Sequence, residues 1–173
     1  MAQRTDIFDL GRLSLHSGEG RRIDTAVTVD PLAFGGQTYE TGERDVPVRL
    51  DVSRTMGGYA LRLRFSVQLD GPCMRCLEAA QRSIDVDARE VDQPGSGDDD
   101  ELTSPYLTRD ELDLRSWARD ALALALPTQI VCRDDCLGLC PLCGENLNDA
   151  GPDHQHESAP DPRWAKLSEL KFE

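Results

Sequence analysis

The chain has 173 residues, with 39% apolar and 5% aromatic side chains, which is enough for one hydrophobic core of modest size. Its 19 Lys and Arg residues against 32 Asp and Glu residues give a formal net charge of −13. This charge argues against broad, non-specific nucleic-acid binding, because such binding needs a high density of cations. The longest apolar stretch, residues 121–126, is too short for a membrane span, and the first residues have no apolar segment of a secretory signal. We therefore expect a cytoplasmic protein without a membrane partner.

The first half of the chain is expected to form antiparallel strands. Apolar and polar residues alternate over residues 46–52 and again over residues 59–69, as in strands with one buried face. Two consecutive glycines between these runs favour a tight turn, so the two runs are predicted to form a hairpin. Shorter alternations over residues 23–29 and 84–88 predict one strand before the hairpin and one after it.

One principal helix is predicted after an acidic loop. Residues 94–105 contain turn formers and a run of acidic side chains, which indicates a solvated loop. Residues 114–126 then carry apolar side chains at helical spacing, and Asp113 is a suitable N-cap. Pro127 is expected to end the helix, because proline disfavours the helical conformation of the residue before it. The fold class is therefore α+β, a mainly antiparallel β-sheet or open barrel with one principal helix.

The domain organisation follows from the same patterns. Residues 1–148 are predicted to form a single domain, with the acidic loop inside it and a zinc-knuckle segment at its C-terminal end. Residues 149–173 are polar and contain prolines, so we expect a mobile tail. A short apolar set within this tail is predicted to dock as one helical turn, formed by Trp164, Leu167 and Leu170.

Charge is distributed unevenly along the chain. Residues 1–93 carry 12 basic and 15 acidic side chains, a net of −3, whereas residues 94–173 carry 7 basic and 17 acidic, a net of −10. The candidate RNA-binding residues are Arg49, Arg62, Arg64 and Arg75. The first three share the outward face of the predicted hairpin, and the fourth lies between two cysteines. An ordinary solvated sheet face is the simpler interpretation of the first three.

Six cysteines occur in close pairs. They form Cys-x2-Cys over residues 73–76 and Cys-x3-Cys-x3-Cys-x2-Cys over residues 132–143. In a reducing compartment, such pairs usually serve metal or redox chemistry rather than structural disulfides. A Cys-x2-Cys turn directs two sulfurs toward one ion, and two such turns supply the tetrahedral thiolate set that Zn²⁺ prefers. The pattern therefore predicts zinc as the cofactor.

Three sets of four cysteines fit this spacing. The preferred set joins the two Cys-x2-Cys pairs, although 63 residues lie between them: Cys73, Cys76, Cys140 and Cys143. The second set is Cys73, Cys76, Cys132 and Cys136, and the third is the local set Cys132, Cys136, Cys140 and Cys143. In the first two sets, a metal ion would tie the segment after the helix back to the sheet.

No catalytic site is predicted. His154 and His156 lie in the polar tail and are expected to face solvent, and His16 is alone in a loop. The sequence contains no Gly-rich phosphate loop, no Ser/His/Asp set and no His-Glu-x-x-His motif. We therefore expect a protein that is not an enzyme and has no small-molecule substrate.

Several short motifs resemble the YceD family. The cysteine segment from Cys132 to Asn148 is the most specific of them. The others are Phe8-Asp9-Leu10, Cys73-Met74-Arg75-Cys76-Leu77, Leu124-Ala125-Leu126-Pro127 and Asp161-Pro162-Arg163-Trp164-Ala165-Lys166-Leu167. The resemblance implies a single YceD-like domain and a role in the accumulation of large-subunit (23S) ribosomal RNA. It also implies the bacterial cytoplasm or a plastid as the compartment.

Two hypotheses for the mode of action follow. The leading one is a non-enzymatic ribosome-biogenesis factor that binds precursor rRNA through the arginine-bearing sheet face and the knuckles, with zinc fixing their geometry. The alternative is an acidic protein-binding module, whose C-terminal half attracts a basic large-subunit ribosomal protein by electrostatic complementarity.

Overall fold

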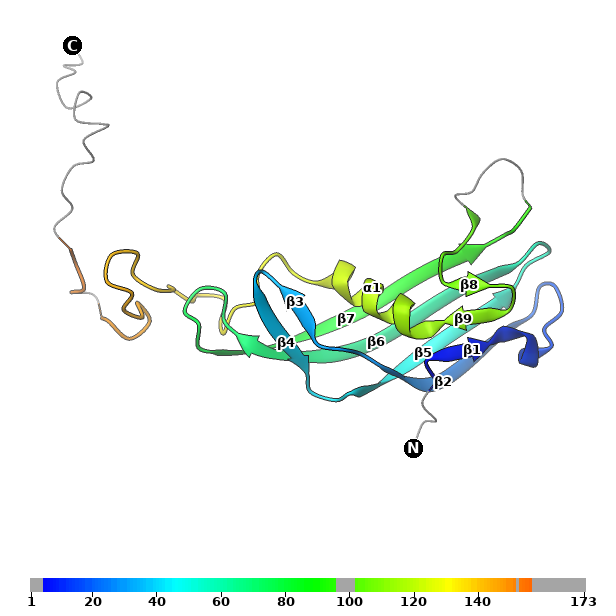
Figure 1. Cartoon of the computed structure of the whole chain (residues 1–173), viewed down its shortest axis with the longest axis horizontal. Coiled ribbons are helices and arrows are strands. Elements are labelled where there is room, and N and C mark those ends of the chain that lie inside the picture. Colours follow the sequence, from blue (N-terminus) through cyan, green and yellow to red (C-terminus); the bar gives the residue numbers. More distant parts are fainter. Residues whose placement is uncertain (1–4, 96–101, 152, 157–173) are drawn as a thin grey trace, which may run out of the picture.

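A computed structural model of the protein describes residues 5–95, 102–151 and 153–156 (Figure 1). The middle of the acidic loop and the predicted docking segment around Trp164 lie outside the described residues. In chain order, the elements are β1 (Ile7–Asp9), the 3-10 helix η1 (Leu10–Leu13), β2 (Gly20–Thr28), β3 (Leu32–Phe34), β4 (Gln37–Thr41), β5 (Asp45–Arg54), β6 (Tyr59–Pro72), β7 (Ala79–Asp92), β8 (Leu107–Thr108), β9 (Glu111–Asp113) and α1 (Leu114–Ala125).

The two longest strands of the main sheet are β6 and β7. They pair along their whole length, from Tyr59 opposite Asp92 to Pro72 opposite Ala79. Along the other edge of β6, β5 pairs with the first part and β4 with two residues near the end. β2 and β3 lie outside β5 and β4, and β1, β9 and β8 form a smaller sheet. All these pairs are antiparallel, and within the described residues β7 pairs with β6 alone, so the sheet is open rather than closed into a barrel.

The predicted hairpin is confirmed as β5 and β6. Leu50, Leu61 and Leu63 are buried on one face of these strands, as the alternation requires. Gly58 is needed in the turn, because a Cβ atom there would lie 1.8 Å from the carbonyl oxygen of Asp92. The strands predicted before and after the hairpin are β2 and β7. β7 is much longer than its apolar alternation indicates, because its pairing with β6 continues past the apolar part.

Helix α1 begins where the sequence predicts and ends one residue earlier than predicted. The Asp113 carboxylate accepts a hydrogen bond of 2.9 Å from the backbone N–H of Ser116, which satisfies one of the free N–H groups of the first turn. The last helical residue is Ala125, two residues before Pro127. In the part of the chain that the structure describes, no helix is long and apolar enough to cross a bilayer.

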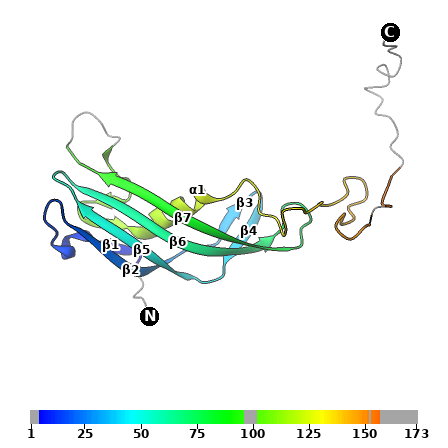
Figure 2. The ribbon, with the colours of Figure 1, turned by 180° about the vertical axis from the view of Figure 1, so that it is seen from behind.

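The hydrophobic core lies between α1 and one face of the main sheet. Trp117, Ala118 and Leu122 of the helix belong to the same buried cluster as Leu50 and Leu63 of the strands. Figure 1 shows the helix lying across the long strands, and Figure 2 shows the opposite face with no helix on it. The outer face of the sheet is therefore not covered by a helix and can carry charged side chains.

The far end of β6 is held in place by Tyr39 of β4. Its hydroxyl donates a hydrogen bond of 2.9 Å to the carbonyl oxygen of Pro72. Gly71 allows this contact, because a Cβ atom there would lie 2.4 Å from the Tyr39 ring. The packing fixes the backbone immediately before Cys73, the first of the six cysteines.

Candidate metal centre

The turn between β6 and β7 presents Cys73 and Cys76. The backbone N–H of Cys73 donates to the carbonyl of Glu78 at 2.6 Å, and the N–H of Leu77 donates to the carbonyl of Cys73 at 3.0 Å. Leu77 has a positive φ of 65°, which lets the chain turn back tightly. The long β6–β7 pair therefore ends in a rigid loop with both sulfurs on one side.

The segment after α1 is joined to this turn by backbone hydrogen bonds. Met74 donates its N–H to the carbonyl of Ile130 at 2.9 Å, and Leu139 donates its N–H to the carbonyl of Arg75 at 3.1 Å. Ile130 is fully buried, which anchors the beginning of the segment to the core. We call the turn of residues 73–78 together with residues 129–148 the cysteine lobe.

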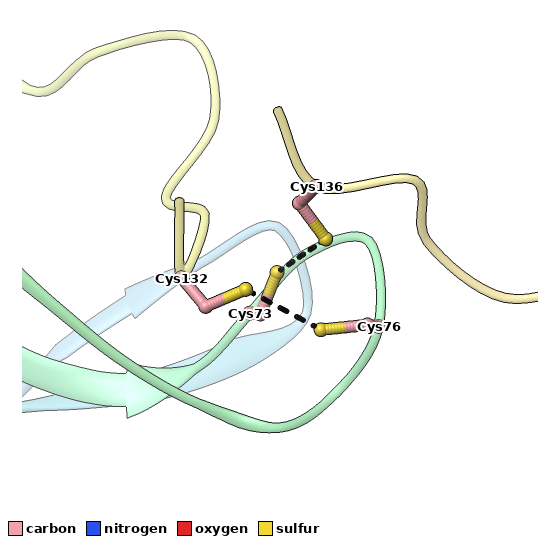
Figure 3. A group of neighbouring side chains, drawn as sticks. All are labelled: Cys73, Cys76, Cys132 and Cys136. Atoms are coloured by element: carbon pink, nitrogen blue, oxygen red, sulfur yellow. Dashed lines mark hydrogen bonds between the residues drawn. The ribbon is translucent and has the colours of Figure 1, made fainter. Parts of the chain in front are cut away.

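Four of the cysteines converge in this lobe. The sulfurs of Cys73, Cys76, Cys132 and Cys136 all lie within 4.8 Å of one another (Figure 3). The Sγ–Sγ distance is 3.8 Å between Cys73 and Cys136 and 3.6 Å between Cys76 and Cys132, and all four are free thiols. A tetrahedral ion with Zn–S bonds of about 2.3 Å needs sulfurs about 3.8 Å apart. The four cysteines therefore fit a tetrahedral metal ion.

The surroundings of the four thiols raise the pKa of two of them and lower the pKa of the other two. Burial raises the pKa of the Cys76 thiol to about 12 and also raises that of Cys132. Burial acts in the same direction on Cys73, but backbone N–H groups, including those of Cys76 and Arg75, outweigh it and lower its pKa to about 6. The Asn148 side-chain amide, 3.5 Å from the Cys136 sulfur, lowers the pKa of Cys136. A bound cation is what would allow all four to be thiolates together.

The structure corrects the preferred ligand set. It groups Cys73 and Cys76 with Cys132 and Cys136, the second of the three predicted sets, and it places Cys140 and Cys143 in a separate group with two histidines. The reason is local, because the chain after Cys136 leaves the cluster through Gly138, which has a φ of +80° and packs against Arg75.

One histidine of the polar tail, His154, differs from the expectation that both face solvent, whereas His156 is exposed as expected. His154 exposes only 13% of its side chain and lies against Cys143, and the ring of His156 contacts that of His154. These histidines, and the Asn148 amide beside Cys136, had no part in the ligand sets predicted from cysteine spacing. In the sequence, the feature that comes nearest to indicating these histidines as ligands is the His-x-His pair that begins 11 residues after Cys143.

Three of the four candidate RNA-binding arginines lie on the outer face of the sheet, each beside an aspartate. Arg49 donates to Asp24 at 3.2 Å, and Arg62 donates to Asp87 at 2.7 Å. Arg64 pairs with Asp51, which also accepts a hydrogen bond from Arg22. The hydrogen bond from Arg22, reinforced by Arg64, lowers the pKa of Asp51, and the one from Arg62 lowers that of Asp87. The positive charge of this face is therefore largely compensated.

Arg75 occupies a different environment in the cysteine lobe. Its guanidinium donates to the side-chain carbonyl of Gln129 at 3.1 Å and to the backbone carbonyl of Cys136 at 3.0 Å. Among the described residues, no carboxylate lies within ion-pair distance of it. Arg75 therefore links the two parts of the lobe, and no carboxylate among the described residues compensates its positive charge.

An open antiparallel sheet that carries a cluster of four thiols at one end defines a small, β-rich protein with a candidate metal centre. A family model described as "Large ribosomal RNA subunit accumulation protein YceD" matches residues 61–171, which include most of β6, all of β7 and α1, and all six cysteines. The chain belongs to the YceD family, which that description names for the accumulation of large-subunit ribosomal RNA.

Several proteins are similar to the chain. An uncharacterized protein of Mycobacterium bovis is 40% identical over 104 residues, which cover 58% of this chain and 49% of that protein. An uncharacterized protein of Mycobacterium leprae is 30% identical over 171 residues, covering 95% and 76%. The maize protein named "Large ribosomal RNA subunit accumulation protein YCED homolog 1, chloroplastic" is 28% identical over 182 residues, covering 85% and 60%. The matched region thus spans about half the length of the Mycobacterium bovis relative, and no solved structure matches the chain.

Proposed function

We propose that this protein is a non-enzymatic assembly factor that supports the accumulation of large-subunit rRNA in the cytoplasm, with zinc bound by Cys73, Cys76, Cys132 and Cys136. Membership of the YceD family supports the ribosomal role. The donor set supports a structural ion, because four sulfur ligands leave no open position for water or substrate. When bound, zinc would supply the cross-link that keeps the segment after α1 against the β6–β7 turn.

The direct partner that the geometry favours is a basic large-subunit ribosomal protein. The observation that carries this choice is the pairing of Arg49, Arg62 and Arg64 with aspartates, which leaves the outer sheet face without a free basic stripe. A chain with a net charge of −13 repels a polyanion and attracts a polycation. In the cysteine lobe, Asp134 and Asp135 expose 90% and 84% of their side chains and lie 3.4 Å from Arg82 and Arg133. The lobe still has a net negative charge, because it holds four acidic side chains and two basic ones.

Precursor rRNA is the second candidate, and one observation favours it. Arg75 has no carboxylate partner among the described residues, and it is exposed in the turn that holds Cys73 and Cys76 of the four-sulfur cluster. An RNA contact through this residue would be confined to the cysteine lobe rather than spread over the sheet.

The experiment measures binding of the full chain to purified large-subunit ribosomal proteins, with and without ribonuclease. Binding to 23S rRNA is measured separately. We expect capture of a basic ribosomal protein that resists ribonuclease, and weaker capture by the variant Asp134→Asn/Asp135→Asn. The variant Arg62→Gln/Arg64→Gln should bind like the unaltered protein. Glutamine is preferred to glutamate here, because a new carboxylate would face Asp87 or Asp51.

The variant Arg75→Gln separates the two candidates, with Arg12→Gln as the control because Arg12 lies in η1, outside the cysteine lobe. Loss of rRNA binding in Arg75→Gln alone, together with protein capture that disappears after ribonuclease, would replace the protein partner with RNA. Absence of binding to both classes would reject the proposed function.

A further inference from the structure

The turn at Cys140–Cys143 repeats the backbone geometry of the turn at Cys73–Cys76. In the first turn, Cys73 donates its N–H to the residue five positions later, and the residue at position four donates back to Cys73. In the second, Cys140 donates its N–H to the carbonyl of Glu145 at 2.8 Å, and Gly144 donates to the carbonyl of Cys140 at 2.9 Å. The residue at position four has a positive φ in both turns, 65° at Leu77 and 76° at Gly144. The chain therefore contains two turns of one kind, and only one of them belongs to the four-sulfur cluster.

Two histidines complete the second turn. The Nε2 atom of His154 lies 3.6 Å from the Cys143 sulfur, and the Nε2 atom of His156 lies 3.1 Å from that of His154. The ligand atoms of both cysteines and both histidines lie within 4.8 Å of one another. Two imidazole nitrogens that face each other beside two sulfurs are arranged as they would be around a common cation.

The carboxylate of Glu145 orients the more buried histidine. Its Oε2 atom lies 3.0 Å from Nδ1 of His154. When Nδ1 carries the proton and donates it to this carboxylate, Nε2 has a free lone pair that points at the cysteines. A carboxylate that holds the far nitrogen of an imidazole is the usual support of a metal-bound histidine.

The distances agree with tetrahedral coordination. Zn–N bonds of about 2.0 Å and Zn–S bonds of about 2.3 Å place two nitrogens about 3.3 Å apart and a nitrogen and a sulfur about 3.5 Å apart. The observed separations are 3.1 Å between the nitrogens and 3.6 Å between nitrogen and sulfur.

We propose that Cys140, Cys143, His154 and His156 form a second metal site that takes a zinc-type divalent cation, separate from the four-sulfur cluster. The ion would tie the chain around residue 154 to the second turn and so extend the cysteine lobe beyond residue 148. Cys143 and His156 are exposed, whereas three sulfurs of the first cluster are buried. The second ion should therefore exchange and be removed by a chelator faster than the first. This inference goes beyond the proposed function and does not depend on the partner.

Metal titration of the full chain tests the proposal. The purified protein is stripped and reloaded with Co²⁺ alone, and bound metal is measured by elemental analysis while the visible spectrum is recorded. We expect about two equivalents per chain, with one spectral component of four-sulfur type and one of mixed sulfur–nitrogen type. The variant His154→Ala/His156→Ala should lose about half of the bound metal and the mixed component only. The control His16→Ala alters the third histidine and should keep both.

Two further results decide the matter. Cys136→Ser should lose the four-sulfur component and keep the mixed one, which separates failure of the first site from failure of the second. Retention of the four-sulfur component in His154→Ala/His156→Ala shows that this variant is folded. A stoichiometry unchanged by the double histidine substitution, or a reloaded protein with no mixed sulfur–nitrogen component, would overturn the second site.

Discussion

The main sheet buries leucines and valines along its length, whereas the cysteine lobe leaves Leu77, Leu137 and Leu142 each more than half exposed. In the sheet, Leu50 and Leu63 have no exposed surface, and α1 adds Trp117 to the same core. Apolar burial of this extent stabilises the sheet by itself. In the lobe, Ile130 and three of the clustered cysteines join this core, and the remaining structure depends on sulfur ligands and backbone hydrogen bonds, as in small modules that need a metal to fold.

The two regions also handle charge differently. On the sheet, arginines and aspartates from different strands form cross-strand pairs, such as Arg62 with Asp87. In the lobe, Arg133 pairs with Asp135 two residues later, and Arg75 uses its guanidinium to join the two lobe segments. We therefore expect lobe substitutions to act locally and sheet substitutions to act on the whole fold, and the following changes test that difference.

The largest effect is expected from removing the ion of the four-sulfur cluster. In Cys136→Ser, the four-sulfur site should lose its metal-binding free energy, on the order of 10 kcal/mol for a structural zinc site, and residues 129–139 should detach from the β6–β7 turn while the sheet stays folded. Limited proteolysis with mass spectrometry should find new cleavage sites within residues 129–139 and none within β5 or β6. The control Cys143→Ser, outside this cluster, should keep the four-sulfur ion. Unfolding of the sheet together with the lobe would show that the two regions are one cooperative unit.

Leu63→Ala should have the next largest effect, on the sheet. Leu63 is fully buried, so the cavity and the lost transfer energy should lower the free energy of unfolding by about 2–5 kcal/mol. Urea denaturation followed by circular dichroism measures this change. Leu124→Ala removes a side chain that is 89% exposed and should change stability by less than about 0.5 kcal/mol. Similar losses in both variants would contradict the assignment of the core.

Removal of the helix cap should have a smaller effect. Asp113→Ala eliminates the acceptor for the Ser116 N–H and should destabilise the protein by about 1 kcal/mol. Asp113→Asn keeps a capping oxygen and should restore most of the loss. The same denaturation curves give the result, and an alanine variant as stable as the asparagine variant would reject the cap.

The smallest effect concerns the compensated charges of the sheet. Hydrogen bonds from Arg22 and then Arg64 lower the pKa of Asp51 in the folded state, so its contribution is complete above the unfolded pKa of about 4 and is lost as the pH falls through the lowered folded value. Asp51→Asn should therefore destabilise the protein at pH 6 by up to about 1 kcal/mol and have little effect at pH 2. Glu43→Gln, at an exposed carboxylate, is the control. A loss that is equal at both pH values would indicate lost packing rather than the ion pairs.

Local patterns accounted for much of the sheet region. The two-residue alternation identified β5 and β6, and Asp113 with Pro127 bounded α1, because these features act between residues close in the chain. The short strands β1, β3, β4, β8 and β9 were missed. Each has two to five residues, too few for an alternation to be distinguished from a loop, and each forms only because a neighbouring strand supplies its hydrogen bonds.

By itself, the sequence determined the spacing of the cysteine pairs, the faces of the long strands and the ends of the helix. Only the tertiary structure decided that Cys132 and Cys136, rather than Cys140 and Cys143, meet Cys73 and Cys76. It also decided that aspartates from neighbouring strands cover the arginines of the outer face. Alternation and capping are set by the geometry of a few consecutive residues. Which sulfurs meet across more than 50 residues, and which charges meet between neighbouring strands, depends instead on strand register and on where the chain leaves the core. Neither is encoded in local spacing.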